Sequence, residues 1–213
     1  MRPQHHPSEA VLADYAAGVL ADGPSLAVAS HLELCACCRK ATVLFEAVGG
    51  ELLEDMAPSQ MAPDALASTL ARLDQAPPVS KPIARRVGPE GLRLPLALSG
   101  RRIGRRRFVA PGFWVAPVKS NSPDGWRTYL LRAPAGGQVF FHGHNGPEYT
   151  VILRGAYLDG GRRYLVGDFA ECDASDSHRP SADIGEPCIC LLSGQGGLRG
   201  EGLLHLVKVA LGV

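Results

Sequence analysis

The sequence predicts an α+β protein in two domains, a small all-α helical bundle followed by an all-β barrel. Apolar residues recur at helical spacing through residues 1–75, and a stretch rich in proline, glycine and arginine follows at 76–107. Short β-like runs separated by turns then fill residues 108–213, which is typical of an antiparallel sandwich or barrel. The predicted units are therefore a helical domain at 1–75, a linker with a lead-in strand at 76–107, and a β-domain at 108–213.

The composition is that of a globular protein and excludes an acidic disordered chain or a strongly basic one. Of the 213 residues, 46% are hydrophobic and 20% are charged, and the net charge is only +1. The N-terminal residues lack a signal-peptide pattern, and the apolar stretch at 202–213 is too short to span a bilayer. We therefore expect a cytoplasmic protein with no membrane partner. Thiols stay reduced in that compartment, so clustered cysteines indicate metal ligands or redox groups rather than disulfides.

Within the helical half, Ser8 can cap a first helix that Asp22-Gly23-Pro24 ends. A second helix is predicted from about Ser25 to Gly49-Gly50. A third opens at Pro63-Asp64, and its leucines follow an i, i+4, i+7 pattern that forms one stripe: Leu66, Leu70 and Leu73.

The stretch HLELCACCRK at 31–40 contains one histidine and three cysteines. At about 100° per helical residue, three of these side chains fall within about 60° of arc: His31, Cys35 and Cys38. Cys37 points away and is expected to be a packed thiol. Because a closed tetrahedral zinc site needs four nitrogen or sulfur ligands, we predict His6 as the fourth, with His5 as the alternative. The competing interpretation is a helix that carries buried histidine and cysteine without a metal.

The order His6, then His31-x3-Cys35-x2-Cys38, resembles the zinc-binding anti-sigma factors. The resemblance covers about the first 75 residues. It implies a helical zinc domain that clamps the two helical domains of a sigma factor of the extracytoplasmic-function class, in a 1:1 complex. On this resemblance the stripe Leu66, Leu70 and Leu73 becomes a candidate sigma contact. The alternative is that the stripe packs within its own bundle.

Several arginines stand in the predicted linker at 76–107. They are interpreted as solvated charge; a docking surface for an acidic partner is a second interpretation. Direct DNA contact is a third, but no recognised DNA-binding motif accompanies the arginines, so we expect no direct nucleic-acid partner.

A second set of metal-ligand residues lies in the β-half. His142 and His144 point to the same side of a strand, and a Gly146-Pro147 turn can return Glu148 to the same site. His178 follows downstream. Three imidazoles and one carboxylate suit zinc, iron, manganese, nickel or copper, and the ligand types do not choose between these metals. The competing interpretation is a solvent-facing group of histidines.

This set resembles the cupins. The first cupin motif, G-x5-H-x-H-x3-4-E-x6-G, is matched by Gly136, His142, His144, Glu148 and Gly155. In the second motif, Gly167 and His178 match, whereas Asp173, Ser175 and Ala182 replace the usual proline, glycine and asparagine. The resemblance covers about residues 108–200 and implies a small β-barrel with a metal in its mouth. The altered second motif changes the residues of the loop around His178 but keeps the ligand set.

A zinc anti-sigma domain followed by a cupin looks like the ChrR-type anti-sigma factors. That resemblance implies a regulator, not an enzyme, which restrains its sigma factor until oxidative stress, notably singlet oxygen or organic hydroperoxide. The cupin domain would carry the response, with a divalent metal for which zinc is our expectation. The rival hypothesis is a cupin metalloenzyme, a dioxygenase or isomerase, with an appended helical domain. A DNA-binding regulator that uses the arginine-rich linker is a third.

Cys188 and Cys190 share one face of a predicted strand. Near an oxidisable metal they are candidate redox groups, whereas most buried strand cysteines are inert packing. Their i, i+2 spacing is poor geometry for a disulfide between them. Cys172 is expected to be structural, and His205 a strand histidine rather than a ligand.

Overall fold

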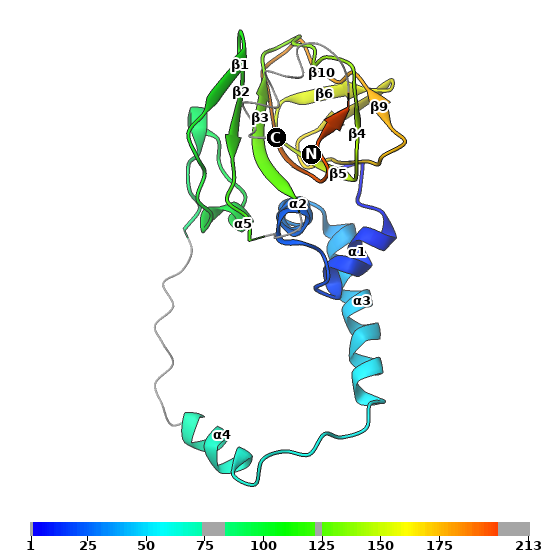
Figure 1. Cartoon of the computed structure of the whole chain (residues 1–213), viewed down its shortest axis with the longest axis vertical. Helices are drawn as coiled ribbons and strands as arrows, with labels where there is room; N and C mark the ends of the chain where they lie inside the picture. The colour runs from blue at the N-terminus through cyan, green and yellow to red at the C-terminus, as the bar shows by residue number, and fades with distance from the viewer. Residues whose placement is uncertain (1, 74–83, 122–124, 200–213) are drawn as a thin grey trace.

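The computed structural model describes residues 2–73, 84–121 and 125–199. Helices dominate the N-terminal part and antiparallel strands the C-terminal part (Figure 1). The α-helices within these ranges are α1 (Glu9–Ala16), α2 (Asp22–Leu32), α3 (Ala36–Glu54), α4 (Ala65–Leu73) and α5 (Leu96–Ser99), with a short 3-10 helix η1 (Pro89–Gly91). The predicted α+β class is confirmed.

The strands form three antiparallel sheets. The largest has the order β1-β2-β3-β11-β5-β8, formed by β1 (Arg107–Ala110), β2 (Phe113–Pro117), β3 (Arg127–Ala133), β11 (Cys188–Gly194), β5 (Glu148–Arg154) and β8 (Phe169–Cys172). The second has the order β10-β6-β7, formed by β10 (Ser181–Ala182), β6 (Ala156–Asp159) and β7 (Arg162–Leu165). The third has the order β12-β4-β9, formed by β12 (Leu198–Arg199), β4 (His142–His144) and β9 (Ser177–His178). Hydrogen bonding between the described strands does not close the barrel into one continuous sheet.

Ser8 caps α1 as predicted, because its hydroxyl accepts a hydrogen bond from the backbone N–H of Val11. The prediction that Asp22-Gly23-Pro24 ends the first helix is wrong, because α1 already ends at Ala16 and α2 begins at Asp22. The lack of a side chain at Gly23 lets the start of α2 lie directly on the sheet, where a Cβ would overlap the hydroxyls of Thr128 and Ser193. Asp22 adds a two-pronged ion pair with Arg101, at 2.6 and 2.7 Å.

The single long helix predicted from Ser25 to Gly50 is instead two helices. α2 ends at Leu32, and α3 starts after Cys35, whose extended backbone places it at the N-cap. α3 then continues past the two glycines to Glu54. The argument that placed His31, Cys35 and Cys38 on one face of one helix is therefore wrong, although the three side chains still meet.

α2 lies between the other helices and the sheet (Figure 1). It packs on α1 and α3 and also on β3, β5 and β11, so its side chains are buried on nearly every face. One continuous core runs from Val28 in α2 to Trp114 and Leu191 in the sheet. The helical part is thus joined to the β-part by a hydrophobic core rather than by a tether alone.

Residues 84–107, predicted as part of a linker, contribute to this core. Leu92, Leu94 and Leu98 are almost fully buried. The carboxylate of Glu90 accepts hydrogen bonds from the indole N–H of Trp114 and the guanidinium of Arg132. This segment is therefore packed structure. Residues 74–83 lie outside the described ranges, and the predicted domain limits remain predictions.

In the β-half, most of the predicted runs are strands, whereas the short strands β6, β9, β10 and β12 are not evident from the sequence. The last part of the predicted β-domain, residues 200–213 with His205, lies outside the described residues. None of the helices within the described ranges is long and apolar enough to cross a membrane.

Candidate metal centres

The first centre lies where α2 ends and α3 begins. Nδ1 of His6 is 3.3 Å from Sγ of Cys35 and 3.4 Å from Sγ of Cys38. Nε2 of His31 is 3.3 Å from the same Cys38 sulfur. The structure thus brings the four predicted ligands near one another, with His6 beside both sulfurs and His31 beside the sulfur of Cys38. His5, the alternative fourth ligand, points elsewhere, to Asp168.

Cys37 differs from its prediction as a packed thiol that points away. It is exposed, and its Sγ lies 3.5 Å from Sγ of Cys35 and 3.9 Å from Nδ1 of His6. His6, Cys35, Cys37 and Cys38 form a compact group that can hold a metal ion. Its position follows from the start of α3 at Ala36, because the first turn presents Cys37 and Cys38 beside the N-cap residue Cys35. The cluster therefore offers five possible ligands rather than four.

The start of α3 suits thiolate ligands. Burial raises the pKa of the Cys35 thiol, but hydrogen bonds from the backbone N–H of Cys38 and from neighbouring donors lower it by a larger amount. The net shift of this pKa is therefore downward. The N-terminal end of a helix also favours a negative charge. Cys35 is thus placed where its ionised form is stabilised.

His31 is fully buried, and burial lowers its pKa to about 4, so the ring is neutral at physiological pH. Its Nδ1 lies 2.6 Å from the carbonyl oxygen of Gly167 in the turn before β8. A carbonyl only accepts, so Nδ1 carries the proton and Nε2 presents its lone pair to the cluster. A carbonyl behind a histidine that faces a metal is a common outer-shell arrangement.

Asp168, next in the chain, fixes the N-terminal segment to the same turn. Its carboxylate is almost completely buried. It accepts hydrogen bonds from the backbone N–H groups of Gln4 and Leu165 at 2.6 and 2.8 Å, and from the backbone and ring of His5 at 3.1 Å each. The backbone N–H of Phe169 then donates to the carbonyl of His5. We call this contact between the segment at 4–5, His31 and the turn at 167–168 the junction.

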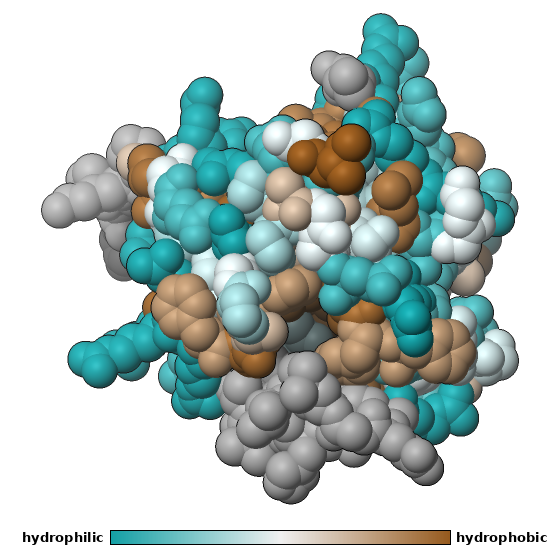
Figure 2. All heavy atoms as spheres, turned by 90° about the horizontal axis from the view of Figure 1, so that it is seen from above, coloured by the Kyte–Doolittle hydropathy of each residue, from teal (hydrophilic) through white to brown (hydrophobic). Residues whose placement is uncertain are grey.

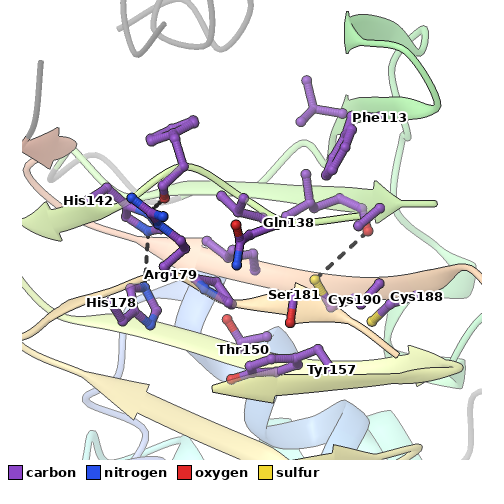
Figure 3. Close-up of a pocket in the computed structure, with 18 of the residues that line it drawn as sticks. Phe113, Gln138, His142, Thr150, Tyr157, His178, Arg179, Ser181, Cys188 and Cys190 are labelled. Carbon is purple, nitrogen blue, oxygen red and sulfur yellow. Dashed lines mark hydrogen bonds between the residues drawn. The ribbon is translucent and has the colours of Figure 1, made fainter. Parts of the chain in front are cut away.

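The second centre lies in the β-half, where β4 and β9 pair. Nε2 of His178 is 3.0 Å from Nε2 of His142 and 3.1 Å from Nε2 of His144. Figure 3 shows His142 and His178 facing each other across this site. The structure thus brings the three predicted histidines together.

The outer nitrogens of two of these rings decide which way their lone pairs point. Nδ1 of His142 donates to the carbonyl of Phe140 at 2.9 Å, and Nδ1 of His178 donates to Asp159 at 2.6 Å. Both Nε2 atoms therefore present lone pairs to the same point. Lone pairs that face each other at about 3 Å repel unless a cation or proton lies between them, so the arrangement fits a shared metal ion.

Glu148, the fourth predicted ligand, stands slightly apart from the three rings. Its carboxylate is 3.6 Å from Nδ1 of His144 and is almost fully buried. Burial raises its pKa to about 7, and the nearby His178 offsets part of that rise. Glu148 is therefore near the centre, but the three-histidine group does not include it.

A cavity of about 390 Å³ opens from this second centre into the β-half. His142 and His178 lie at one end and Cys188 and Cys190 at the other (Figure 3). Burial raises the pKa of Cys188 to about 12 and raises that of Cys190 as well, so both are neutral thiols. A neutral thiol is a weak nucleophile, which favours packing over redox chemistry for this pair.

The helical half also carries exposed apolar side chains. None of the residues of α4 is buried, and Leu66, Leu70 and Leu73 are 67%, 52% and 75% exposed. The alternative that this stripe packs within its own bundle is therefore wrong. α3 adds further exposed apolar residues, which with the three leucines we call the apolar set: Val43, Leu44, Val48, Leu52 and Leu53.

Sequence reasoning missed three residues around these centres: Asp159, Gly167 and Asp168. The Gly-Asp pair marked a turn and the glycine matched a cupin motif, but nothing in the sequence showed what the turn contacts. Asp159 had no signal, because it reaches His178 from a strand that was not predicted.

Comparison with known proteins places these features in a family. The chain is 39% identical over 203 residues to the anti-sigma-E factor ChrR of Cereibacter sphaeroides, with 93% of each chain covered. It also resembles the crystal structure of Rhodobacter sphaeroides SigE in complex with the anti-sigma ChrR, with a TM-score of 0.76 and 36% identity over 90% of this chain and 99% of that one. A cupin-like protein of Ralstonia eutropha is more distant, at a TM-score of 0.41 and 24% identity over 47% of this chain and 68% of that one. No protein-family model matches. The identity to ChrR spans both the helical and the β-half, and this chain therefore belongs to the ChrR family of anti-sigma factors.

Proposed function

We propose that this protein binds and inhibits a sigma factor of the extracytoplasmic-function class in a 1:1 complex in the cytoplasm, and releases it on oxidative stress. The helical half is the binding part, and the cupin half is a metal-dependent sensor. The solved complex named after SigE and ChrR supports the choice of partner.

The observation that carries the proposal is the apolar set on α3 and α4. Eight apolar side chains from Val43 to Leu73 are each at least half exposed. Exposed apolar groups on this scale mark an interaction site in a soluble protein. A helical partner would cover them and provide the burial that these helices lack.

The first centre would hold structural zinc through His6, His31, Cys35 and Cys38. His31, Cys35 and Cys38 are buried, whereas His6 and Cys37 are both exposed, so the site is closed on the side of the first three residues and open on the side of the other two. The ion would connect the N-terminal segment to the α2–α3 boundary and so stabilise the start of α3, which carries five residues of the apolar set. Cys37 remains beside the site as a further sulfur.

The second centre would hold a divalent metal, with zinc as our expectation, through His142, His144, His178 and Glu148. The junction provides a physical connection between the two centres. β8 starts at the junction, and its last residue, Cys172, pairs with Glu148. A change at the second metal would therefore act on β8 and on the turn that holds His31.

The binding test uses Leu70→Asp in the full-length chain. A charge in the apolar set should abolish capture of the sigma factor from the native host, identified by mass spectrometry. Ile184→Asp is the matched control, because Ile184 is 85% exposed but lies in the β-half. An unchanged sigma complex with Leu70→Asp, at wild-type circular dichroism, would exclude α4 from the interface.

The rival hypothesis is catalysis by the cupin half. The three-histidine site beside a cavity is compatible with it. Turnover of a small organic substrate by the metal-loaded protein, retained in Leu70→Asp, would favour the enzyme. The exposed apolar set favours the anti-sigma function.

A further inference from the structure

We propose that the cavity of the β-half binds a medium-chain organic carboxylate, with its carboxylate at the His142–His178 end and its apolar chain toward Cys188. This inference rests on the proposed function of the cupin half as a sensor and names the chemical class of its ligand. Octanoate is the probe that represents this class.

The cavity has the size and walls for such a molecule. Its volume of about 390 Å³ equals that of roughly ten or more non-hydrogen atoms. Apolar side chains form much of the wall away from the histidines, with Phe113, Val115, Leu131, Ala133 and Leu192 among them, and polar groups such as Gln138 and Ser181 stand between them. Pockets of this size with apolar walls and a few polar groups are typical of small-molecule sites.

Three residues that are largely buried present hydroxyl groups to the cavity, and these hydroxyls have no hydrogen-bond partner among the described residues. They belong to Tyr129, Thr150 and Tyr157, each 8% exposed. Thr150 and Tyr157 lie side by side along one wall in Figure 3. Within the described residues no fully buried side-chain oxygen or nitrogen lacks a partner, so these three hydroxyls are open to the cavity and available to a guest with oxygen atoms.

The charges at this end favour an anion. A divalent metal and the guanidinium of Arg179 would together carry more positive charge than the two carboxylates of Glu148 and Asp159 carry negative charge. Arg179 lines the cavity, is exposed at its mouth and forms no ion pair within the described part of the chain. A carboxylate has two oxygens, one for the metal and one for the guanidinium or a hydroxyl.

The surface around the barrel is consistent with entry of an amphipathic molecule. Figure 2, which looks onto the β-half, shows hydrophobic residues gathered beside a hollow in an otherwise mainly hydrophilic surface. An apolar chain that enters beside these hydrophobic residues would not have to contact a continuous ring of charged side chains.

The test is calorimetric titration of octanoate into the zinc-loaded full-length protein. We expect octanoate to bind at least about tenfold more tightly than acetate, because only octanoate has a chain to bury. It should also bind at least about tenfold more tightly than octanol, which lacks the charge. Arg179→Gln should weaken octanoate about tenfold, whereas Arg162→Gln, an exposed arginine outside the cavity, should not.

The outcomes separate this inference from the proposed function. Equal affinity for octanoate and acetate, equal affinity for octanoate and octanol, or no binding of octanoate would each overturn the inference. Sigma release would be measured on the same preparations. If octanoate does not bind but the sigma factor is still released, the inference is overturned and the sensor function stands. If octanoate binds tightly but no sigma complex forms, only the proposed function is overturned.

Discussion

The ring of His31 in the helical half and the backbone of Gly167 in the β-half share a hydrogen bond, with 2.6 Å between Nδ1 and the carbonyl oxygen. The opposite nitrogen of the same ring faces Cys38 at 3.3 Å. One imidazole therefore contacts both the first metal centre and the turn before β8. Because His31 is fully buried, neither contact can change without moving the other.

The first prediction concerns Gly167→Ala. Gly167 has a φ of +91°, and a Cβ there would come within 3.0 Å of Pro3 and Leu34, on the two segments that carry His6 and Cys35. We expect weaker metal binding at the first centre. Cobalt substitution measures this selectively, because only the first centre combines thiolates with the metal and so gives sulfur-to-cobalt absorption.

Gly161→Ala is the matched control. Gly161 also has a positive φ, +77°, but a Cβ there would meet nothing within 4 Å. Both variants carry about 1 kcal/mol of backbone strain, and only Gly167→Ala should lower the cobalt affinity. Equal cobalt affinities in the two variants would show that the junction does not support the first centre.

The second prediction is a pH dependence at Asp168. Burial would raise the pKa of Asp168, but hydrogen bonds from Leu165, Gln4 and His5 lower it below its ordinary value of 3.8. A lowered folded-state pKa stabilises the protein above the ordinary value and loses this effect as the pH falls through the folded value. Asp168→Asn should therefore cost about 1–3 kcal/mol near neutral pH, and the difference from wild type should shrink below about pH 4.

Urea unfolding of both proteins between pH 7 and pH 3 measures that difference. Both contain the same metal ligands, so acid loss of metal affects them alike. A difference that stays constant down to pH 3 would contradict the assignment of a charged, hydrogen-bonded Asp168.

The third prediction is that Asp159→Asn weakens the second centre. Asp159 accepts the proton of Nδ1 of His178 at 2.6 Å and so fixes the ring with Nε2 toward the site. Loss of such an outer-shell carboxylate typically lowers metal affinity about 10- to 100-fold. Competition with a chromophoric chelator measures the affinity. Asp183→Asn, which removes a carboxylate paired with Arg163 away from the site, should bind metal as wild type does.

The fourth prediction removes the second metal. Glu148→Ala combined with His178→Ala should still bind the sigma factor, because both changes lie in the β-half. It should fail to release the sigma factor under oxidative stress. Release is followed by size-exclusion chromatography of the purified complex after exposure to a photosensitiser and light. Normal release by the double variant would remove the sensor role from this centre.

The sequence predicted both groups of candidate metal ligands because their spacing is local. His31, Cys35 and Cys38 lie within eight positions, and His142, His144 and Glu148 within seven, so turn and strand geometry alone bring them close. The candidate ligands still lie near one another, although the single helix predicted for them is two helices, α2 and α3. The break between α2 and α3 still places Cys35 and Cys38 beside each other, because Cys35 caps the helix whose first turn holds Cys38.

The sequence did not determine whether the leucine stripe on α4 is exposed, since the same helical period suits a buried core face or a surface that binds a partner. The tertiary structure shows that the stripe is exposed, and it also shows which residues meet at the junction. Gly167 and Asp168 meet His31 and His5 across more than 130 positions of chain, and Asp159 reaches His178 from an unpredicted strand. Local spacing determines which side chains can converge within a turn or strand. Which distant backbone atom stands behind a ligand depends on the packing of α2 against the sheet, and no periodicity encodes that packing.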